Sequence, residues 1–359
     1  MTRHQAERAA WMAGITGLLG AAIGWLFASV AFPHAWLAAL TAWLGWPLGC
    51  VGLLLIHALT GGRWGYAIRP QLVAGTRTVL LLLPAVIPLL IVLRTLYPWA
   101  RPDVAAHLGN RFYLNLPFFL GRGAVYLIVW LGLAGLILRA LQQDIPDARL
   151  ARLAPAGLIL LAITVTFAAI DTTMSLEPQF ASSAYGLIAI AEMGLPALSV
   201  SMFAAVVGPP PDGGTLRSLG QLLLGLLILW AYLDFMQVLI VWQSDLPNEA
   251  PWYIVRSRGG WGIAAALVAG CHFVLPFFAL LSPRLQGSPR GIAYVTALLI
   301  LSAVVRGWWL VVPASGRNFG LVDVFAMLGL IGIAAALALR APPLPGFPEG
   351  VRRHVQEIP

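Results

Sequence analysis

Long apolar stretches separated by short polar connections run along nearly all of the 359 residues. A membrane-spanning helix needs about 20 mostly apolar residues, because each residue adds about 1.5 Å to its length. Ten stretches satisfy this requirement: 11–31, 35–59, 78–97, 117–139, 153–173, 181–207, 217–243, 259–281, 291–313 and 320–340. The pattern predicts an all-α polytopic membrane protein with about ten transmembrane helices. We expect one transmembrane domain over residues 11–340, an N-terminal segment 1–10 and a C-terminal tail 341–359.

The first apolar stretch ends in Ser29-Val30-Ala31, which resembles the small-residue site where a signal peptide is cleaved. Its apolar core is about 20 residues long, whereas the core of a signal peptide has about 7–15. We therefore expect an uncleaved first helix.

Composition agrees with a lipid environment. Hydrophobic residues make up 60% of the chain and charged residues 10%, against about 45–50% and 25% in an average soluble domain. The formal net charge is +8, and every basic residue is an arginine. No basic face interleaved with aromatic residues is present, which argues against nucleic-acid binding. The bilayer is the expected surrounding.

The distribution of arginines predicts the orientation. Fourteen of the 22 arginines fall in the two terminal segments and in the connections after helices two, four, six and eight. The other 8 fall on the opposite side. Because cytoplasmic loops are richer in Arg and Lys, we expect both termini to be cytoplasmic, in the inner membrane of a bacterium.

The cysteines exclude several cofactor sites. Cys50 and Cys271 lie far apart, each inside an apolar stretch. Two isolated cysteines make neither an iron–sulfur site nor a c-type haem attachment. We expect no metal and no cofactor in this chain.

Three ionisable side chains lie deep inside predicted helices, where a charge is costly and therefore marks a functional candidate. Glu192, Asp234 and His272 would lie roughly 14–20 Å below the same membrane boundary. Groups at one depth on consecutive helices can relay a proton, and Gln237, on the Asp234 face, could orient that acid. The alternative is that they are neutral and hydrogen-bond across helices as packing contacts.

Two further acids flank the outer end of the fifth stretch. Asp171 and Glu177 form either the outer mouth of a proton path or a contact with a partner, or else they cap free backbone amides. The hypothetical proton path comprises Asp171, Glu177, Glu192, Asp234, Gln237 and His272.

Arg122 and Arg306 lie close to predicted helix ends. The default expectation is that each snorkels to the headgroups. The alternative is pairing with an intramembrane carboxylate or a quinone oxygen.

The connection LIVWQSDLPNEAPWYIV (239–255) brings two of the 14 acidic residues together. Asp245 and Glu249 lie among prolines that stiffen the turn. We interpret it as a rigid loop whose acids cap helices and could dock a partner.

Several stretches, in this order, resemble one family. They are HALTGGRWGYAIRPQ (57–71), LYPWA (96–100), YLNLPFF with Arg122 (113–122), MSLEPQF (174–180), WAYLDFMQVLIVW (230–242), LPNEAPWY (246–253), GGW (259–261) and HFVLPFF (272–278). Together they resemble the ten-helix ActF-type membrane subunit of bacterial alternative complex III, a quinol:cytochrome c oxidoreductase. That family is distantly related to the NrfD-type membrane subunits of polysulfide reductases.

The resemblance implies two four-helix bundles plus peripheral helices, beside a sister NrfD-like membrane subunit. It also implies periplasmic iron–sulfur and cytochrome c subunits, with cytochrome c or a terminal oxidase as electron acceptor. Quinol, iron–sulfur clusters and haem c then belong to partner subunits. The family motifs include Arg122, Glu177, Gln237, Glu249 and His272. Glu192 and Asp234 match no family pattern, and the family carries an acid near the position of Arg306.

We therefore expect a cofactor-free membrane subunit of a respiratory quinol:electron-acceptor oxidoreductase, with proton conduction as a hypothesis and no catalytic residue of its own. Two alternatives stay open. One is a stand-alone paralogue acting in assembly or as a scaffold. The other is a secondary transporter, although paired broken helices are not evident in the two halves.

Overall fold

The computed structural model describes residues 2–341 except 106–107, 144 and 245. Among these residues, ten helical segments are long and apolar enough to cross a membrane, and no strand occurs. The all-α polytopic architecture is therefore confirmed. The spanning segments are α1 (Arg3–Phe27), α2 (Phe32–Thr60), α3 with α4 (Arg63–Arg77, Leu82–Leu96), α6 (Leu116–Ala140), α7 (Pro146–Thr172), α8 (Tyr185–Val207), α9 (Gly213–Gln243), α11 with α12 (Gly260–Leu267, Leu275–Leu280), α14 (Pro289–Val311) and α15 (Leu321–Arg340). Short helices in the connections are α5 (Pro102–Ala105), α10 (Ala250–Ser257) and α13 (Pro283–Gln286).

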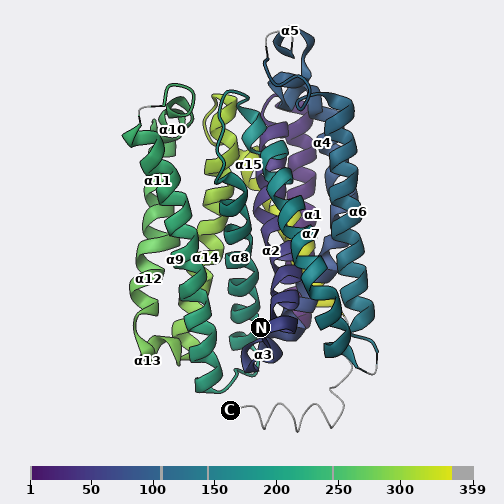
Figure 1. Cartoon of the computed structure of the whole chain (residues 1–359), viewed down its shortest axis with the longest axis vertical. Helices are drawn as coiled ribbons and strands as arrows, with labels where there is room; N and C mark the ends of the chain where they lie inside the picture. The colour runs from purple at the N-terminus through teal and green to yellow at the C-terminus, as the bar shows by residue number, and fades with distance from the viewer. Residues whose placement is uncertain (1, 106–107, 144, 245, 342–359) are drawn as a thin grey trace.

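The helices form two four-helix bundles and a peripheral pair (Figure 1). The first bundle consists of α2, the joined α3 and α4, α6 and α7. The second consists of α8, α9, the joined α11 and α12, and α14. Helices α1 and α15 pack against each other outside the bundles, and α15 contacts α2. Helix α2 also contacts α8 and α14, so it joins the two bundles.

The peripheral pair is held by glycines. A Cβ added to Gly17 of α1 would collide with the backbone of Gly329 in α15, so small residues let the two backbones approach closely. Elsewhere α1 exposes large apolar side chains, such as Phe27 at 86%. Such exposure suits a helix that faces lipid.

Close contacts also fix the level of the helices around α2. A Cβ added to Gly49 of α2 would collide with the carbonyl oxygen of Met193 in α8. A Cβ added to Gly307 of α14 would lie 2.7 Å from the Cβ of Ala42. Glu192 and Arg306 directly precede two of these residues. Helix packing on α2 therefore holds both charged residues at the depth of the α2 midsection.

Several helices begin earlier than the apolar pattern predicted. The third spanning helix starts at Arg63 rather than at residue 78, and α7 starts at Pro146 rather than at residue 153. Arg69 of α3 is 2% exposed and pairs with Asp147 of α7 at 2.6 Å. Because these charges are satisfied across the helix contact, the polar residues can continue the helices beyond the apolar stretches.

The eighth spanning helix changes pitch around His272. Residues Val268–Val274 form a π-helical segment between α11 and α12. Pro276 has no backbone N–H and cannot bond the carbonyl four residues earlier, which is that of His272. Widened turns of this kind absorb a local break in the α-helical ladder.

Both ends of the described chain lie on one face of the molecule. The Arg3 Nε donates a hydrogen bond to the carbonyl of Leu339 at 2.8 Å, so α1 begins where α15 ends. We call this side the terminal face. The opposite side, which carries α5 and α10, is the loop face (Figure 1).

Candidate functional site

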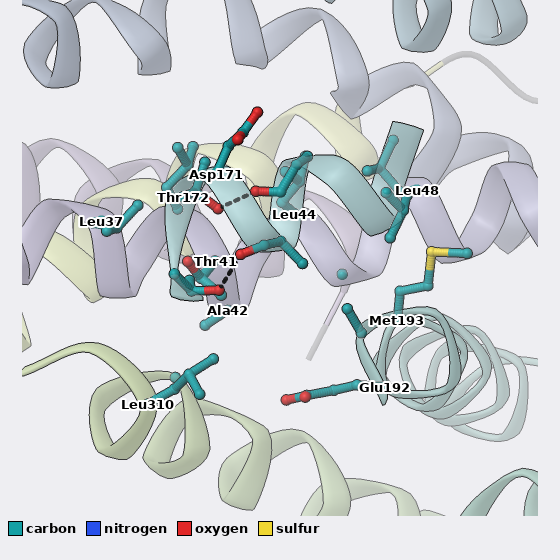
Figure 2. A pocket seen from close by; sticks show the side chains of 18 of the residues that line it. Leu37, Thr41, Ala42, Leu44, Leu48, Asp171, Thr172, Glu192, Met193 and Leu310 are labelled. Atoms are coloured by element: carbon teal, nitrogen blue, oxygen red, sulfur yellow. Dashed lines mark hydrogen bonds between the residues drawn. The ribbon is translucent and has the colours of Figure 1, made fainter. Parts of the chain in front are cut away.

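A cavity of about 360 Å³ lies between the two bundles, and its walls come from α2, α4, α6, α7, α8, α9 and α14. Most of the lining is apolar, with leucines of α2 and α4 prominent. Figure 2 shows Glu192 extending from α8 into the cavity, toward the wall that carries Leu310, with Thr41, Ala42 and Leu44 nearby. Pockets that bind small molecules share this character, with apolar walls and a few polar groups.

Arg306 of α14 joins two acids at one end of this cavity. Its Nε donates to Glu192 Oε1 at 2.8 Å, and its Nη2 donates to Asp234 Oδ1 at 2.8 Å. The guanidinium carbon also lies 4.8 Å from the centre of the Trp230 ring. The expectation that Arg306 snorkels to the headgroups is wrong, because its side chain points inward and is 3% exposed. We call Glu192, Asp234 and Arg306 the Arg306 cluster.

The two acids of the cluster face the cavity. The side chains of Glu192 and Asp234 are 27% and 26% exposed, and both line the cavity. Each carboxylate thus has one oxygen on the arginine and surface left for another partner. The sequence placed these acids at one depth, and the structure brings them onto one guanidinium.

Gln237 lies one helical turn beyond Asp234 but does not orient it. Its Oε1 accepts from the Ser182 hydroxyl at 2.5 Å, and its Nε2 donates to the Tyr253 hydroxyl at 2.8 Å. Gln237 therefore ties α9 to the segment before α8 and to α10 at the loop-face end of the cavity.

His272 lines the same cavity from the π-helical segment and is 1% exposed. Its Nδ1 lies 2.7 Å from the Ser302 hydroxyl, which donates its own proton to the Leu298 carbonyl at 2.8 Å. In the tautomer protonated at Nδ1, the hydroxyl oxygen accepts from Nδ1–H while donating to Leu298, and Nε2 is then the acceptor of a neutral ring. Nε2 has no hydrogen-bond partner among the described residues. The Trp230 ring meets the imidazole edge-on, with centroids 4.7 Å apart.

Asp171 lines another part of the cavity and forms a closed ion pair. Both of its carboxylate oxygens accept from Arg122, each at 2.8 Å, and Tyr126 donates to Oδ2 at 2.6 Å. The capping and snorkelling expectations for these two residues are therefore wrong. Asp171 is only 1% exposed, so its carboxylate is fully enclosed by these donors.

Glu177 also pairs with an arginine rather than capping a helix. Arg256 of α10 donates from Nη1 to Glu177 Oε1 at 2.6 Å. The same guanidinium donates to the Leu310 carbonyl at 2.9 Å and stacks 3.7 Å from the centre of the Trp252 ring. Burial lowers the pKa of Arg256 below its ordinary value, opposed mainly by the charge of Glu177. Through these contacts Arg256 holds α10 against the segment before α8 and against the end of α14.

The 239–255 connection contains a short helix. Glu249 occupies the N-cap position of α10, but its side chain makes no capping hydrogen bond there. Asp245 lies outside the described residues. Nothing in the structure tests whether either acid docks a partner.

Sequence analysis missed the partners that complete these sites. Arg256 was counted only as a loop arginine, although its spacing of four residues from Trp252 is typical of stacking on one helix face. Tyr126 and Ser302 gave no sequence signal, and Trp230 appeared only as the first residue of the quoted 230–242 stretch. In the described part of the chain, no group of three or more His, Cys, Asp or Glu side chains is arranged to hold a metal ion.

Comparison of the sequence with protein-family profiles and with curated proteins finds no match. The likeness to alternative complex III therefore depends on the motifs quoted above.

Proposed function

We propose that this chain is a membrane subunit of a respiratory quinol:electron-acceptor oxidoreductase of the alternative complex III type, and that the Arg306 cluster is its proton-transfer centre. The ordered motifs support the assignment to such a complex. The geometry of the cluster supports the proton-transfer role, and the two parts are tested separately.

The observation that carries the proton-transfer role is the charge balance of the cluster. One guanidinium faces two carboxylates, so the group is neutral only when one carboxylate holds a proton. Net charge is costly in the low-dielectric interior of a membrane protein. Arg122, Arg256 and Arg317 each pair with one carboxylate instead, namely Asp171, Glu177 and Asp323. Those pairs are balanced without a mobile proton, whereas the Arg306 cluster holds one that either acid can carry.

The surroundings of the cluster allow that proton to leave. Both acids are partly exposed and line the cavity, and His272 lines the same cavity. Toward the loop face, the cavity reaches Gln237 and Tyr253, which are hydrogen-bonded to each other. In this proposal a proton passes between Glu192 and Asp234 and is exchanged through the cavity. Twelve described arginines lie in the terminal segments and in the connections assigned to that side, which supports a cytoplasmic orientation of the terminal face.

The proton-transfer role is tested with Glu192→Gln and Asp234→Asn in the complex purified with its partners and reconstituted into vesicles. An internal pH dye reports protons moved, and cytochrome c reduction reports electrons. Each variant should lower the ratio of protons to electrons, because one acid and one guanidinium form a balanced pair without a mobile proton. Asp103→Asn, which changes an exposed acid of the loop face, is the matched control. An unchanged ratio in both cluster variants would contradict the role.

Membership of the complex is tested by affinity purification of the tagged chain from its own membranes. Haem c absorbance and iron–sulfur signals should co-purify in fixed ratio with a second multi-helix subunit. Isolation of the chain alone under conditions that preserve other respiratory complexes would contradict the assignment.

A further inference from the structure

The terminal-face end of the second bundle, where α13 lies (Figure 1), carries three exposed arginines. Arg217 lies in the first turns of α9, Arg284 in α13 and Arg290 at the start of α14. Among the described residues, the arginines that form ion pairs are others, at positions 69, 122, 256, 306 and 317. These three guanidinium groups therefore have no carboxylate of the described chain in contact with them.

The fold brings the three arginines to one place. Helix α13 packs on both α9 and α14. A Cβ added to Gly287, which follows α13, would lie 3.8 Å from Arg217 Nη2, so the guanidinium of Arg217 lies against the turn between α13 and α14. Arg284 and Arg290 flank that turn, one on each side of Gly287. We call Arg217, Arg284 and Arg290 the arginine patch.

The helices that carry the patch offer it little negative charge. No acidic residue occurs between Glu249 and Asp323, so α13 and α14 contain none. Helix α9 begins after Asp212, whose two carboxylate oxygens accept hydrogen bonds from the backbone N–H and the hydroxyl of Thr215. These bonds, together with the charge of Arg63, lower the pKa of Asp212. That carboxylate is therefore engaged with other partners, and the patch keeps its positive charge for an anion from outside the chain.

The surface beside the patch is apolar. Leu281 and Leu285, on either side of Arg284 in the sequence, are both exposed. Further along α12, Leu275 and Phe278 are exposed as well, so apolar surface continues from the patch toward the middle of the membrane. Arginines at the end of an apolar helix lie where hydrocarbon gives way to head groups. The patch therefore lies at the depth of the phosphate groups of the adjacent leaflet.

We propose that the arginine patch binds the phosphate of an anionic glycerophospholipid, whose acyl chains lie along Leu281 and Leu285. Guanidinium groups bind phosphate oxygens through paired, charge-assisted hydrogen bonds, and basic pockets between the cytoplasmic ends of spanning helices bind the head groups of acidic phospholipids. An acidic soluble protein would match the charge but would leave the exposed leucines uncovered, whereas a lipid matches both. The inference does not rest on the proposed function, because it uses only residues of the terminal face.

The test compares the patch with two arginines of the first bundle. The patch variant combines Arg217→Gln with Arg284→Gln. The matched control combines Arg149→Gln with Arg152→Gln, because both are exposed arginines near the start of α7 and their loss changes the net charge equally. Each full-length protein in dodecyl maltoside is titrated with dioleoylphosphatidylglycerol, which is anionic, or with dioleoylphosphatidylcholine, which has the same acyl chains and no net charge. Native mass spectrometry gives the dissociation constant of the first bound lipid.

Each arginine of the patch should contribute about a fivefold factor to the affinity for the anionic lipid. The wild type and the control should therefore bind phosphatidylglycerol about a hundredfold more tightly than phosphatidylcholine. The patch variant should lose about 25-fold in affinity for phosphatidylglycerol and keep its affinity for phosphatidylcholine. Arg290→Gln alone should lose about fivefold, which covers the case in which the double variant does not fold.

Equal affinities of the wild type for the two lipids, or an equal loss in the patch variant and the control, would overturn the proposal. Displacement of phosphatidylglycerol by excess inorganic phosphate would also overturn it, because the patch would then be a simple anion site that does not recognise a lipid. None of these outcomes changes the proton-to-electron ratio of the reconstituted complex, so failure here is distinct from failure of the proposed function.

Discussion

Replacing Glu192 and Asp234 with their amides, singly and together, tests the charge balance of the Arg306 cluster without any partner subunit. Each single variant keeps one arginine–carboxylate contact at 2.8 Å. The other contact becomes a hydrogen bond to a neutral amide oxygen, a loss of about 1 kcal/mol. The remaining carboxylate and the guanidinium then form a pair that is balanced without a bound proton, which partly offsets that loss. Each single variant should therefore lie within about 1 kcal/mol of the wild type.

The double variant Glu192→Gln, Asp234→Asn should behave differently. It leaves Arg306, which is 2% exposed, without a counter-charge. An uncompensated buried charge costs about 3–5 kcal/mol. The double variant should thus exceed the sum of the single losses by about 1–3 kcal/mol, a coupling typical of side chains in one ionic network.

The free energy of unfolding is measured by titration with sodium dodecyl sulfate in mixed micelles, followed by tryptophan fluorescence. Asp103→Asn should stay within about 0.5 kcal/mol of the wild type, as expected for a substitution at an exposed position. Additive losses, or a single variant that costs as much as the double, would show that each acid has its own counter-charge. The shared-guanidinium argument would then be refuted.

Three further substitutions test other parts of the structure. Asp171→Asn removes the counter-charge of Arg122 and should lower the free energy of unfolding by about 3 kcal/mol in the same titration. Gly49→Leu should force α2 away from α8, so gel filtration should show mostly aggregated protein. Asp212→Ala removes the N-cap of α9 and should cost about 1 kcal/mol. Hydrogen bonds from the Thr215 hydroxyl and backbone N–H lower the pKa of Asp212. That stabilisation is present above the ordinary carboxyl range and is lost as pH falls through the lowered pKa, so the difference between wild type and variant should vanish in acid.

The number and position of the spanning helices could be predicted from sequence because each helix needs about 20 mostly apolar residues of its own, whatever its neighbours are. The predicted starts were late where charged residues continue a helix. Arg69 lies inside α3 rather than at its end, because its charge is paired with Asp147 of α7, 78 residues further along the chain. A hydropathy scale counts every charged residue as unfavourable in a spanning helix, whether or not the charge is paired. Helices whose ends carry paired charges are therefore predicted to be shorter than they are.

The acids of the site could be predicted, but their counter-charge could not. Glu192 and Asp234 stood out because each interrupts an apolar stretch. Arg306 lies 114 residues from the first and 72 from the second, and its position near the end of α14 favoured snorkelling. Only the seating of α14 on α2, through Gly307 against Ala42, turns this arginine inward. The contacts of Arg306 depend on how several helices pack together, and such packing produces no periodic pattern in the sequence.

The Arg306 cluster lines the cavity between the two bundles, so its electrostatics depend on what occupies that cavity. Whatever fills the cavity sets the dielectric around Glu192 and Asp234, which are 27% and 26% exposed to it. Water would solvate the carboxylate that faces the cavity, whereas an apolar occupant would exclude water and strengthen each arginine–carboxylate attraction. The enclosed pair of Arg317 and Asp323, whose acid is 0% exposed, has no such dependence. An occupant of the cavity would therefore change which acid holds the proton without touching either one.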